Sequence, residues 1–198
     1  MNSKEIPEIL FETRAQWRQW LSENGENTKG VWMVFYKKSS GKPHLSYNEA
    51  VEEALCFGWI DSKPNTLNEE MSKQYYAPRN PKSNWSKLNK TRVAKLLELG
   101  LITDAGMKMI ELAKKTSTWD ALNDVDNLVI PEDLQIALKS LSNAETNFHA
   151  FPASTKKGIL EWILNAKTIE TRSKRILETA TLAGQNIRSN QYVKKQNL

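Results

Sequence analysis

The chain has 198 residues, enough for one domain with a substantial core or for two small ones. Its composition, 39% hydrophobic and 26% charged with a net charge of +5, is that of an ordinary soluble globular protein. The single cysteine, Cys56, excludes an internal disulfide framework and predicts a reducing compartment. The first residues lack a secretory-signal pattern, and the longest apolar run, 31–36, is too short to cross a bilayer. We therefore expect a cytoplasmic protein without membrane insertion.

The first third of the chain alternates strand and helix patterns. Residues 8–12 predict a short strand, and residues 30–37, which are apolar on both faces, predict a central strand covered on both sides. Two capping boxes each predict the start of a helix: Thr13 with Gln16, and Ser46 with Glu49. The second of these helices leads directly into the sequence FGWID, so its packing is expected to orient Asp61.

The middle of the chain is basic between residues 71 and 100. Residues 61–68 are rich in turn formers and predict a loop, and residues 70–77 predict another strand. Ser83 or Asn84 then suits the N-cap of a helix that covers about 85–98. A further helix is predicted to start at Thr103.

The last third predicts helices only. Residues 116–130 show little periodicity and are interpreted as a linker, after which Pro131 suits the first position of a helix. A helical C-terminal unit is expected over 131–187, followed by a flexible basic tail over 188–198. The predicted class is α+β, with an N-terminal domain over 1–115 in which helices pack on a small mixed or antiparallel sheet.

One region has the composition of a binding site. Trp, Asp, Arg, Asn and Ser are densest from Phe57 to Arg92, between turn-forming Gly and Pro residues. Tryptophans would form apolar walls, basic side chains would accept an anionic group, and Asp61 would orient the ligand or act as a base. The candidate ligand-binding residues are Trp59, Asp61, Lys63, Arg79, Lys82, Ser83, Asn84, Trp85, Ser86 and Arg92, and Asp61 is the best catalytic candidate.

The same residues also fit a purely structural interpretation. In that case Asp61 and Arg79 form an ion pair, Ser83 or Asn84 caps a helix, and the tryptophans fill the core. Metal and cofactor chemistry is not indicated, because one cysteine and two histidines stand in unrelated contexts and the common nucleotide-binding and hydrolase motifs are absent from the sequence. We expect neither a metal nor a cofactor.

Several segments resemble a known family in the same order along the chain. ALCFGWIDSK (54–63) and PRNPKSNWSKLNKTRV (78–93) are similar to the signature of the YdeI/OmpD-associated family, also called bacteriocin-protection proteins. PEDLQIAL (131–138), residues 148–163 and AKTIETRSKRI (166–176) resemble its C-terminal helical region. The resemblance covers about residues 11–184 and implies a bacterial protein with an α+β N-terminal part, without implying a reaction.

Three functions remain open at this point. The first is a site for a small anionic ligand, binding or catalytic, in the region from Trp59 to Arg92. The second is a nucleic-acid binder that uses the basic helices, with Tyr75, Tyr76 and Trp85 stacking on unpaired bases. The third is a protein-interaction or stress-protection module without a reaction, in which the aromatic residues are core.

Overall fold

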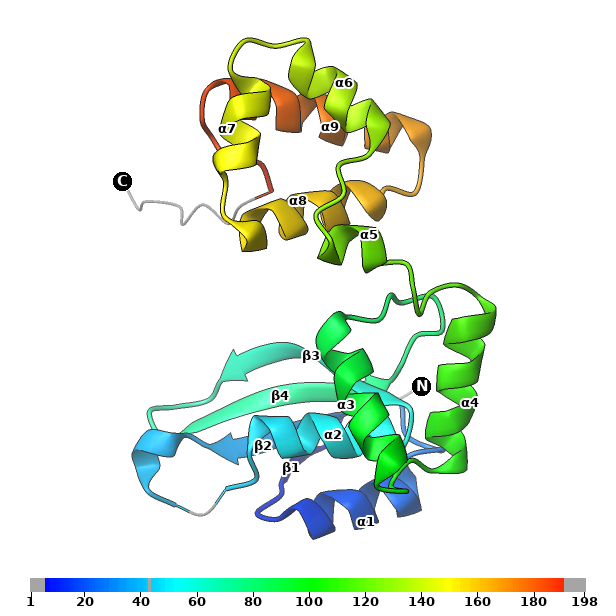
Figure 1. The fold of residues 1–198 in the computed structure, drawn as a ribbon. Coiled ribbons are helices and arrows are strands. Elements are labelled where there is room, and N and C mark those ends of the chain that lie inside the picture. The colour runs from blue at the N-terminus through cyan, green and yellow to red at the C-terminus, as the bar shows by residue number, and fades with distance from the viewer. Residues whose placement is uncertain (1–5, 43, 191–198) are drawn as a thin grey trace, which may run out of the picture. The chain divides into compact units, whose positions relative to one another are not determined.

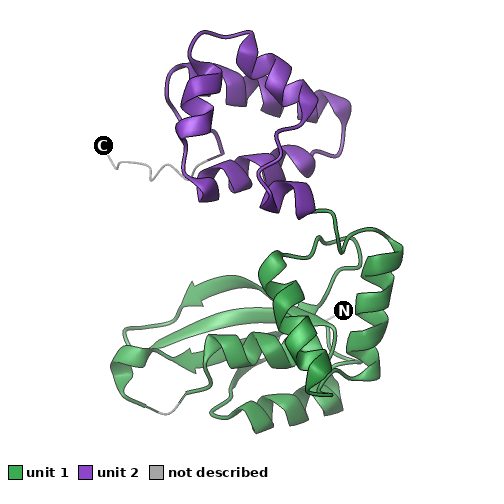
Figure 2. Cartoon of the chain, viewed as in Figure 1, with its two compact units in different colours: residues 1–121 green, residues 122–198 purple. Residues whose placement is uncertain are grey.

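The computed structural model of the protein describes residues 6–42 and 44–190. The chain divides into two compact units, residues 1–121 and 122–198 (Figure 2). The first combines a sheet with helices and the second is helical, which confirms the predicted α+β class. The boundary between the units lies within the segment 116–130 that the sequence suggested as a linker. Of the predicted tail, residues 191–198 lie outside the described residues.

The N-terminal unit is built on one four-stranded mixed sheet (Figure 1). Its strands are β1 (Glu8–Leu10), β2 (Val31–Tyr36), β3 (Trp59–Thr66) and β4 (Met71–Pro78), in the order β1-β2-β4-β3. β1 runs parallel to β2, and the other two pairs are antiparallel. β2 is therefore a central strand, as its apolar sequence predicts, although Trp32 and Tyr36 on one of its faces are only half-buried.

The prediction of a loop over residues 61–68 is wrong. The chain remains a strand as far as Thr66 because it forms a hairpin with β4, in which Asp61 stands opposite Tyr76. Pro64 is tolerated because β3 is an edge strand, where a missing backbone N–H need not break the sheet. The turn comes later, where the N–H groups of Leu67 and Asn68 both donate to the carbonyl of Met71.

Four helices accompany the sheet: α1 (Arg14–Asn24), α2 (Tyr47–Cys56), α3 (Lys87–Glu98) and α4 (Asp104–Lys115). A short 3₁₀ turn, η1 (Lys38–Ser40), follows β2. Both predicted capping boxes are present at the starts of α1 and α2. Thr103 caps α4, as predicted.

Helix α3 begins later than predicted. Its N-cap is Ser86, whose Oγ accepts a hydrogen bond from the N–H of Asn89 at 3.3 Å. The preceding Trp85 is buried, and its backbone N–H donates to the carbonyl of Thr118. This contact holds the chain outside the helix at residue 85, so the cap falls two or three residues after the predicted positions.

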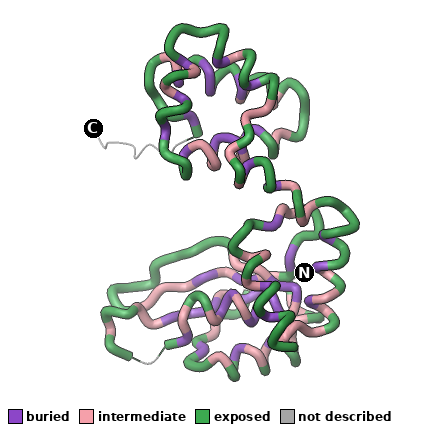
Figure 3. Tube along the Cα trace, viewed as in Figure 1, coloured by how far each residue is buried: buried purple, intermediate pink, exposed green. Residues whose placement is uncertain are grey.

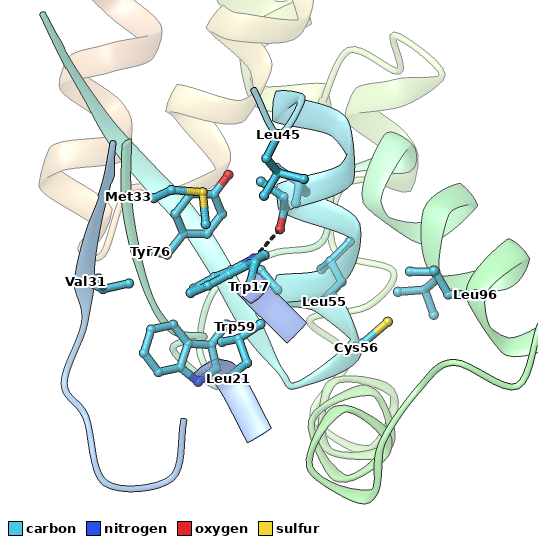
Figure 4. Packing of buried hydrophobic residues seen from close by; sticks show 14 of the residues in the cluster. Trp17, Leu21, Val31, Met33, Leu45, Leu55, Cys56, Trp59, Tyr76 and Leu96 are labelled. Atoms are coloured by element: carbon cyan, nitrogen blue, oxygen red, sulfur yellow. Dashed lines mark hydrogen bonds between the residues drawn. The ribbon is translucent and has the colours of Figure 1, made fainter. Parts of the chain in front are cut away.

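The core of this unit lies between the sheet and the helices α1 and α2. Val31, Met33 and Tyr76 project from the strands toward Trp17 and Leu21 of α1 (Figure 4). The Trp17 indole is fully buried, and its Nε1–H donates to the carbonyl of Ala50 in α2 at 3.0 Å. This bond satisfies the polar atom of a fully buried tryptophan and joins α1 to α2. Buried residues accordingly concentrate along α2 and the central strands (Figure 3).

A buried carboxylate ties α1 to α2. Glu53 is 2% exposed, and its oxygens accept hydrogen bonds from Nε of Arg14 at 2.5 Å and Nη1 of Arg18 at 2.7 Å. Arg14 also donates to Glu52 at 3.0 Å. The two guanidinium groups neutralise the one charge that α2 places inside this interface.

The C-terminal unit has its own core. Its helices are α5 (Asn123–Asp126), α6 (Glu132–Lys139), α7 (Ala144–Ala150), α8 (Ala153–Leu164) and α9 (Ile169–Gly184). Pro131 is the N-cap of α6, one place before the predicted position. Arg172 of α9 binds Asp133 of α6 through two hydrogen bonds of 2.6 and 2.9 Å. The core residues include Leu122, Val125, Leu134, Leu138, Phe148, Ile159, Ile163 and Ala180.

Replacing Glu53 with Ala should destabilise the N-terminal unit by about 2 kcal/mol, because it leaves Arg14 and Arg18 without their buried counter-charge. This loss of stability is smaller than that usual for a buried ion pair, because both arginines are about one-third exposed and can be hydrated. Urea unfolding followed by circular dichroism measures the change. Glu23→Ala, which removes an exposed carboxylate of α1, is the control and should change the stability by less than about 0.5 kcal/mol.

Candidate functional site

The structure divides the ten candidate site residues into three groups. Trp59, Arg79 and Trp85 are buried in or beside the core. Asp61 and Arg92 are half-buried and belong to a cluster of polar side chains. The others, half-buried or exposed, line the β3 strand and the segment that leads into α3: Lys63, Lys82, Ser83, Asn84 and Ser86.

Arg79 is turned inward and holds the segment before α3. It is 5% exposed, its guanidinium lies 3.9 Å from the centre of the Trp85 ring, and Nη2 donates to the carbonyl of Asn84 at 2.5 Å. Burial lowers the pKa of Arg79 to about 10, while the charge of Asp61 acts in the opposite direction. The charge of Asp61 thus affects the pKa of Arg79. The two residues nevertheless form no ion pair within 4 Å among the described contacts. The anion-accepting role expected for Arg79 is not accessible in this arrangement.

The two tryptophans of the candidate site are core residues. Trp59 is 2% exposed, and its Nε1–H donates to the carbonyl of Gly25 at 3.2 Å. Trp85 is 1% exposed and packs its ring 5.0 Å from that of Trp119. Both indole rings are therefore buried, and Trp59 is also among the residues that line a cavity beside the start of α4.

Asp61 is bound by two side chains that the sequence did not single out as site residues. Its Oδ2 accepts hydrogen bonds from the hydroxyl of Tyr47 at 2.7 Å and from Nε2 of Gln74 at 3.2 Å. Gln74 also donates to the carbonyl of Ser62 at 2.8 Å. Burial and the hydrogen bond to Asp61 raise the pKa of the Tyr47 hydroxyl to about 12, so Tyr47 remains a donor at neutral pH. Tyr47 comes from the first turn of α2, which the capping box positions.

Arg92 is held by two neutral amides. Its Nη1 donates to Oδ1 of Asn89 at 2.8 Å, and its Nη2 donates to Oδ1 of Asn48 at 2.7 Å. The charge of Arg92 offsets a small part of the rise in the pKa of both Tyr47 and Tyr76. No carboxylate forms an ion pair with Arg92 among the residues that the structure describes. Tyr47, Asn48, Asp61, Gln74, Asn89 and Arg92 are called the Asp61 cluster below.

Beneath the Asp61 cluster lies a phenol without a hydrogen-bond partner. Tyr76 is fully buried opposite Asp61 in the sheet, and its hydroxyl forms no hydrogen bond within the described part of the chain. Burial, with smaller contributions from Asp61 and Tyr47, raises the pKa of Tyr76 far above its ordinary value. Nε of Arg79 is likewise buried without a partner. The cluster therefore borders polar atoms that packing alone does not satisfy.

A small cavity of about 220 Å³ adjoins the cluster. Two of its lining residues, Tyr47 and Gln74, are those that bind Asp61. The remaining lining residues are Phe35, Tyr36, His44, Leu45, Pro64, Ser72 and Lys73. The cavity thus has aromatic walls and a polar end, a combination typical of small-molecule sites, although it is smaller than most of them.

The segment between β4 and α3 is organised by its own backbone. The carbonyl of Asn80 accepts hydrogen bonds from Oγ and N–H of Ser83, and its side chain accepts one from the N–H of Lys82. Ser86 serves as the cap of α3. Lys63 and Lys82 are exposed.

The described residues support neither a nucleophilic role for Cys56 nor a metal site formed by side chains. Cys56 is fully buried, and burial, with the neighbouring Glu53 charge, raises the pKa of its thiol to about 11. No group of three or more His, Cys, Asp or Glu residues that could hold a metal ion occurs in the described part of the chain. What the Asp61 cluster can do chemically is to accept and donate hydrogen bonds and to neutralise an anion.

The fold and the cluster define a two-unit α+β protein with a polar site near the start of α2. The chain belongs to the family described as "Domain of unknown function (DUF8412)", which residues 9–109 match, and residues 127–186 match the family described as "Bacteriocin-protection, YdeI or OmpD-Associated". The second match confirms the resemblance noted in the sequence, whereas segments 54–63 and 78–93 lie in the first. No curated protein and no solved structure matches the chain.

The two family matches fall on the two structural units (Figure 2). The candidate site residues all lie within the first match, and the family named for bacteriocin protection covers α6 to α9. Among the described residues, none of the helices has the length and apolar character needed to cross a membrane.

Cys56 should react slowly with a thiol reagent in the folded protein. A pKa of about 11 leaves roughly a hundredfold less thiolate at pH 7.5 than an ordinary thiol of pKa 9, and burial blocks access as well. The absorbance released from Ellman's reagent measures the rate. We expect it to be at least a hundredfold slower than in 6 M guanidinium, where the chain is unfolded. A fast reaction of the native protein would instead show that Cys56 is accessible and ionised.

Proposed function

We propose that the N-terminal unit binds a small molecule that carries a carboxylate or phosphate group at the Asp61 cluster. The observation that carries the proposal is the state of Arg92, a half-buried guanidinium held in place by the neutral amide oxygens of Asn48 and Asn89. An arginine oriented by neutral amides, without a carboxylate partner, keeps its charge and its remaining N–H donors for an incoming anion.

The other members of the cluster would recognise the rest of the ligand. Asp61 retains acceptor capacity beyond its bonds to Tyr47 and Gln74 and would bind a hydroxyl or amine of the ligand. The cavity lined by Tyr47 and Gln74 would hold an apolar part of modest size. Lys63, Lys82, Ser83, Asn84 and Ser86 would contribute around the opening, and the N-terminus of α3 adds a positive dipole end on that side.

In this proposal Trp59, Arg79 and Trp85 act as positioning residues. They hold the β3 strand and the segment before α3 in place and do not themselves contact the ligand. Asp61 is the group that would act as a base in a reaction at this site.

The setting we propose is a cytoplasmic protein that acts in stress or bacteriocin protection. The support for the role is the description of the family that residues 127–186 match. The support for the compartment is the single buried cysteine, which offers no partner for an internal disulfide.

The proposal predicts that Arg92→Met weakens the binding of an anion by tenfold or more, since a charge-assisted hydrogen bond contributes about 1.5–3 kcal/mol. A thermal-shift screen of phosphate, pyrophosphate, citrate, succinate and AMP identifies the responding anion, and isothermal titration then gives its dissociation constant. Lys95→Met, which removes an exposed cation one turn further along α3, is the control and should change the affinity by less than twofold.

Two results would contradict this assignment. Equal loss of affinity in Arg92→Met and Lys95→Met would indicate a general effect of charge. The second result is that no anion shifts the melting temperature of the folded protein, while a pull-down recovers one stoichiometric protein partner. This would favour the interaction module instead.

Nucleic-acid binding is a second candidate, and a different surface favours it. Of the three predicted stacking residues, Tyr76 and Trp85 are buried, so Tyr75 alone remains on the surface. It packs its ring 5.3 Å from that of Trp32, over which Lys73 places its ammonium at 4.9 Å. An aromatic pair with a cation on a sheet face is able to stack on unpaired bases.

This second candidate function predicts that the protein binds a fluorescent oligothymidylate of about 15 nucleotides, and that the affinity falls steeply between about 50 and 200 mM salt. Tyr75→Ala should reduce the affinity at least threefold because one stacking contact is lost. Fluorescence anisotropy measures both effects. Affinity that is insensitive to salt, or unchanged in Tyr75→Ala, would exclude this surface.

A further inference from the structure

A second cavity of the N-terminal unit lies apart from the Asp61 cluster and is larger. It encloses about 540 Å³ between the end of α1, the turn from α2 to β3 and the start of α4. Its lining shares no residue with that of the smaller cavity. The lining residues are Leu21, Ser22, Gly25, Glu26, Phe57, Gly58, Trp59, Pro78, Thr103, Asp104, Ala105 and Met109.

The walls of this cavity are mainly apolar. Phe57, Met109 and Ala105 are half-buried, so each presents part of its surface to the space between them. Pro78 is exposed beside them, and only the edge of Trp59 reaches the surface. Its volume lies in the range of ordinary small-molecule pockets and could hold a one-ring or two-ring aromatic body.

The charged side chains that line this cavity are all negative. Glu26 and Asp104 are the only charged residues among those that line the cavity, and both are exposed at its edge. The guanidinium of Arg18 lies 5.3 Å from the centre of the Phe57 ring and forms an ion pair with Glu53. The two carboxylates would repel an anion and attract a cation, in contrast to the guanidinium of Arg92 in the Asp61 cluster.

Close contacts join the end of α2 to the start of α4 at one side of the cavity. The hydroxyl of Thr103 donates to the carbonyl of Cys56 at 2.7 Å, which joins the start of α4 to the end of α2. Gly58 has a positive φ of 73°, and a Cβ added there would lie 3.1 Å from the carbonyl oxygen of Ala105. A Cβ at Gly106 would lie 2.2 Å from the carbonyl oxygen of Cys56. These close approaches fix one wall against the other, so the cavity requires little reorganisation to admit a ligand.

We infer that this cavity is a second binding site, for a small amine with an apolar or aromatic body. The body packs against Phe57, Met109 and Pro78, and the ammonium group lies between Glu26 and Asp104. The inference is independent of the anion site proposed for the Asp61 cluster, because the two sites share no residue and prefer opposite charges.

Three probes of nearly equal size separate the effect of charge from that of the apolar body: phenethylamine, 2-phenylethanol and 3-phenylpropanoate. Titration of the full-length protein at pH 7 is followed by isothermal calorimetry and by amide chemical shifts. We expect the amine to bind at least fivefold more tightly than the alcohol, and the carboxylate to bind least. The amide signals of Gly25, Gly58 and Ala105 should move most.

The double variant Glu26→Gln/Asp104→Asn should lose the preference and bind amine and alcohol equally. The reason is that each exposed ion pair raises the affinity for the amine by about a few-fold. Its matched control is Glu23→Gln/Glu111→Gln, which removes two exposed carboxylates outside the lining and should keep the preference. Equal binding of all three probes by the wild type, a preference that survives in the first variant, or no binding at millimolar concentrations would each overturn the inference.

Discussion

The N-terminal unit depends on the packing of Trp17 between α2 and the sheet. Its ring lies 5.4 Å from that of Tyr76 and 6.3 Å from that of Trp59, and its N–H is bound by the carbonyl of Ala50. These contacts set the height of α2 above β3 and β4. Asp61 lies two residues after Trp59 and opposite Tyr76, so the same packing decides where its carboxylate meets Tyr47.

The starts of two helices supply the rest of the site. The capping box of α2 places Tyr47 and Asn48 in its first turn, and the cap at Ser86 places Asn89 in the first turn of α3. Arg92 is held within α3 by Asn89 and reaches across to α2 through its hydrogen bond to Asn48. Local rules of helix initiation thus bring together residues more than forty positions apart, once α2 and α3 are packed side by side.

The elements with local signals could be predicted from sequence, whereas features that depend on pairing could not. Two capping boxes and the apolar run of β2 identify α1, α2 and the central strand. The β3 strand was mistaken for a loop because its Pro64 is acceptable only at an edge, which the sequence does not reveal. Arg79 carries the composition of a ligand-binding residue, but its burial under Trp85 follows from tertiary packing. Of the missed cluster members, Tyr47 carried a signal as the residue just after a cap.

The hydroxyl of Tyr76 has a consequence for the evolution of stability in this unit. A phenylalanine at that position would fill nearly the same volume and would avoid the free-energy cost of burying a polar atom without a partner. The protein is therefore less stable than it could be at Tyr76, next to Asp61 of the proposed site. Such a loss of stability is typical of regions that are selected for function as well as for packing. A search for more stable variants would begin there and would test what the phenol is kept for.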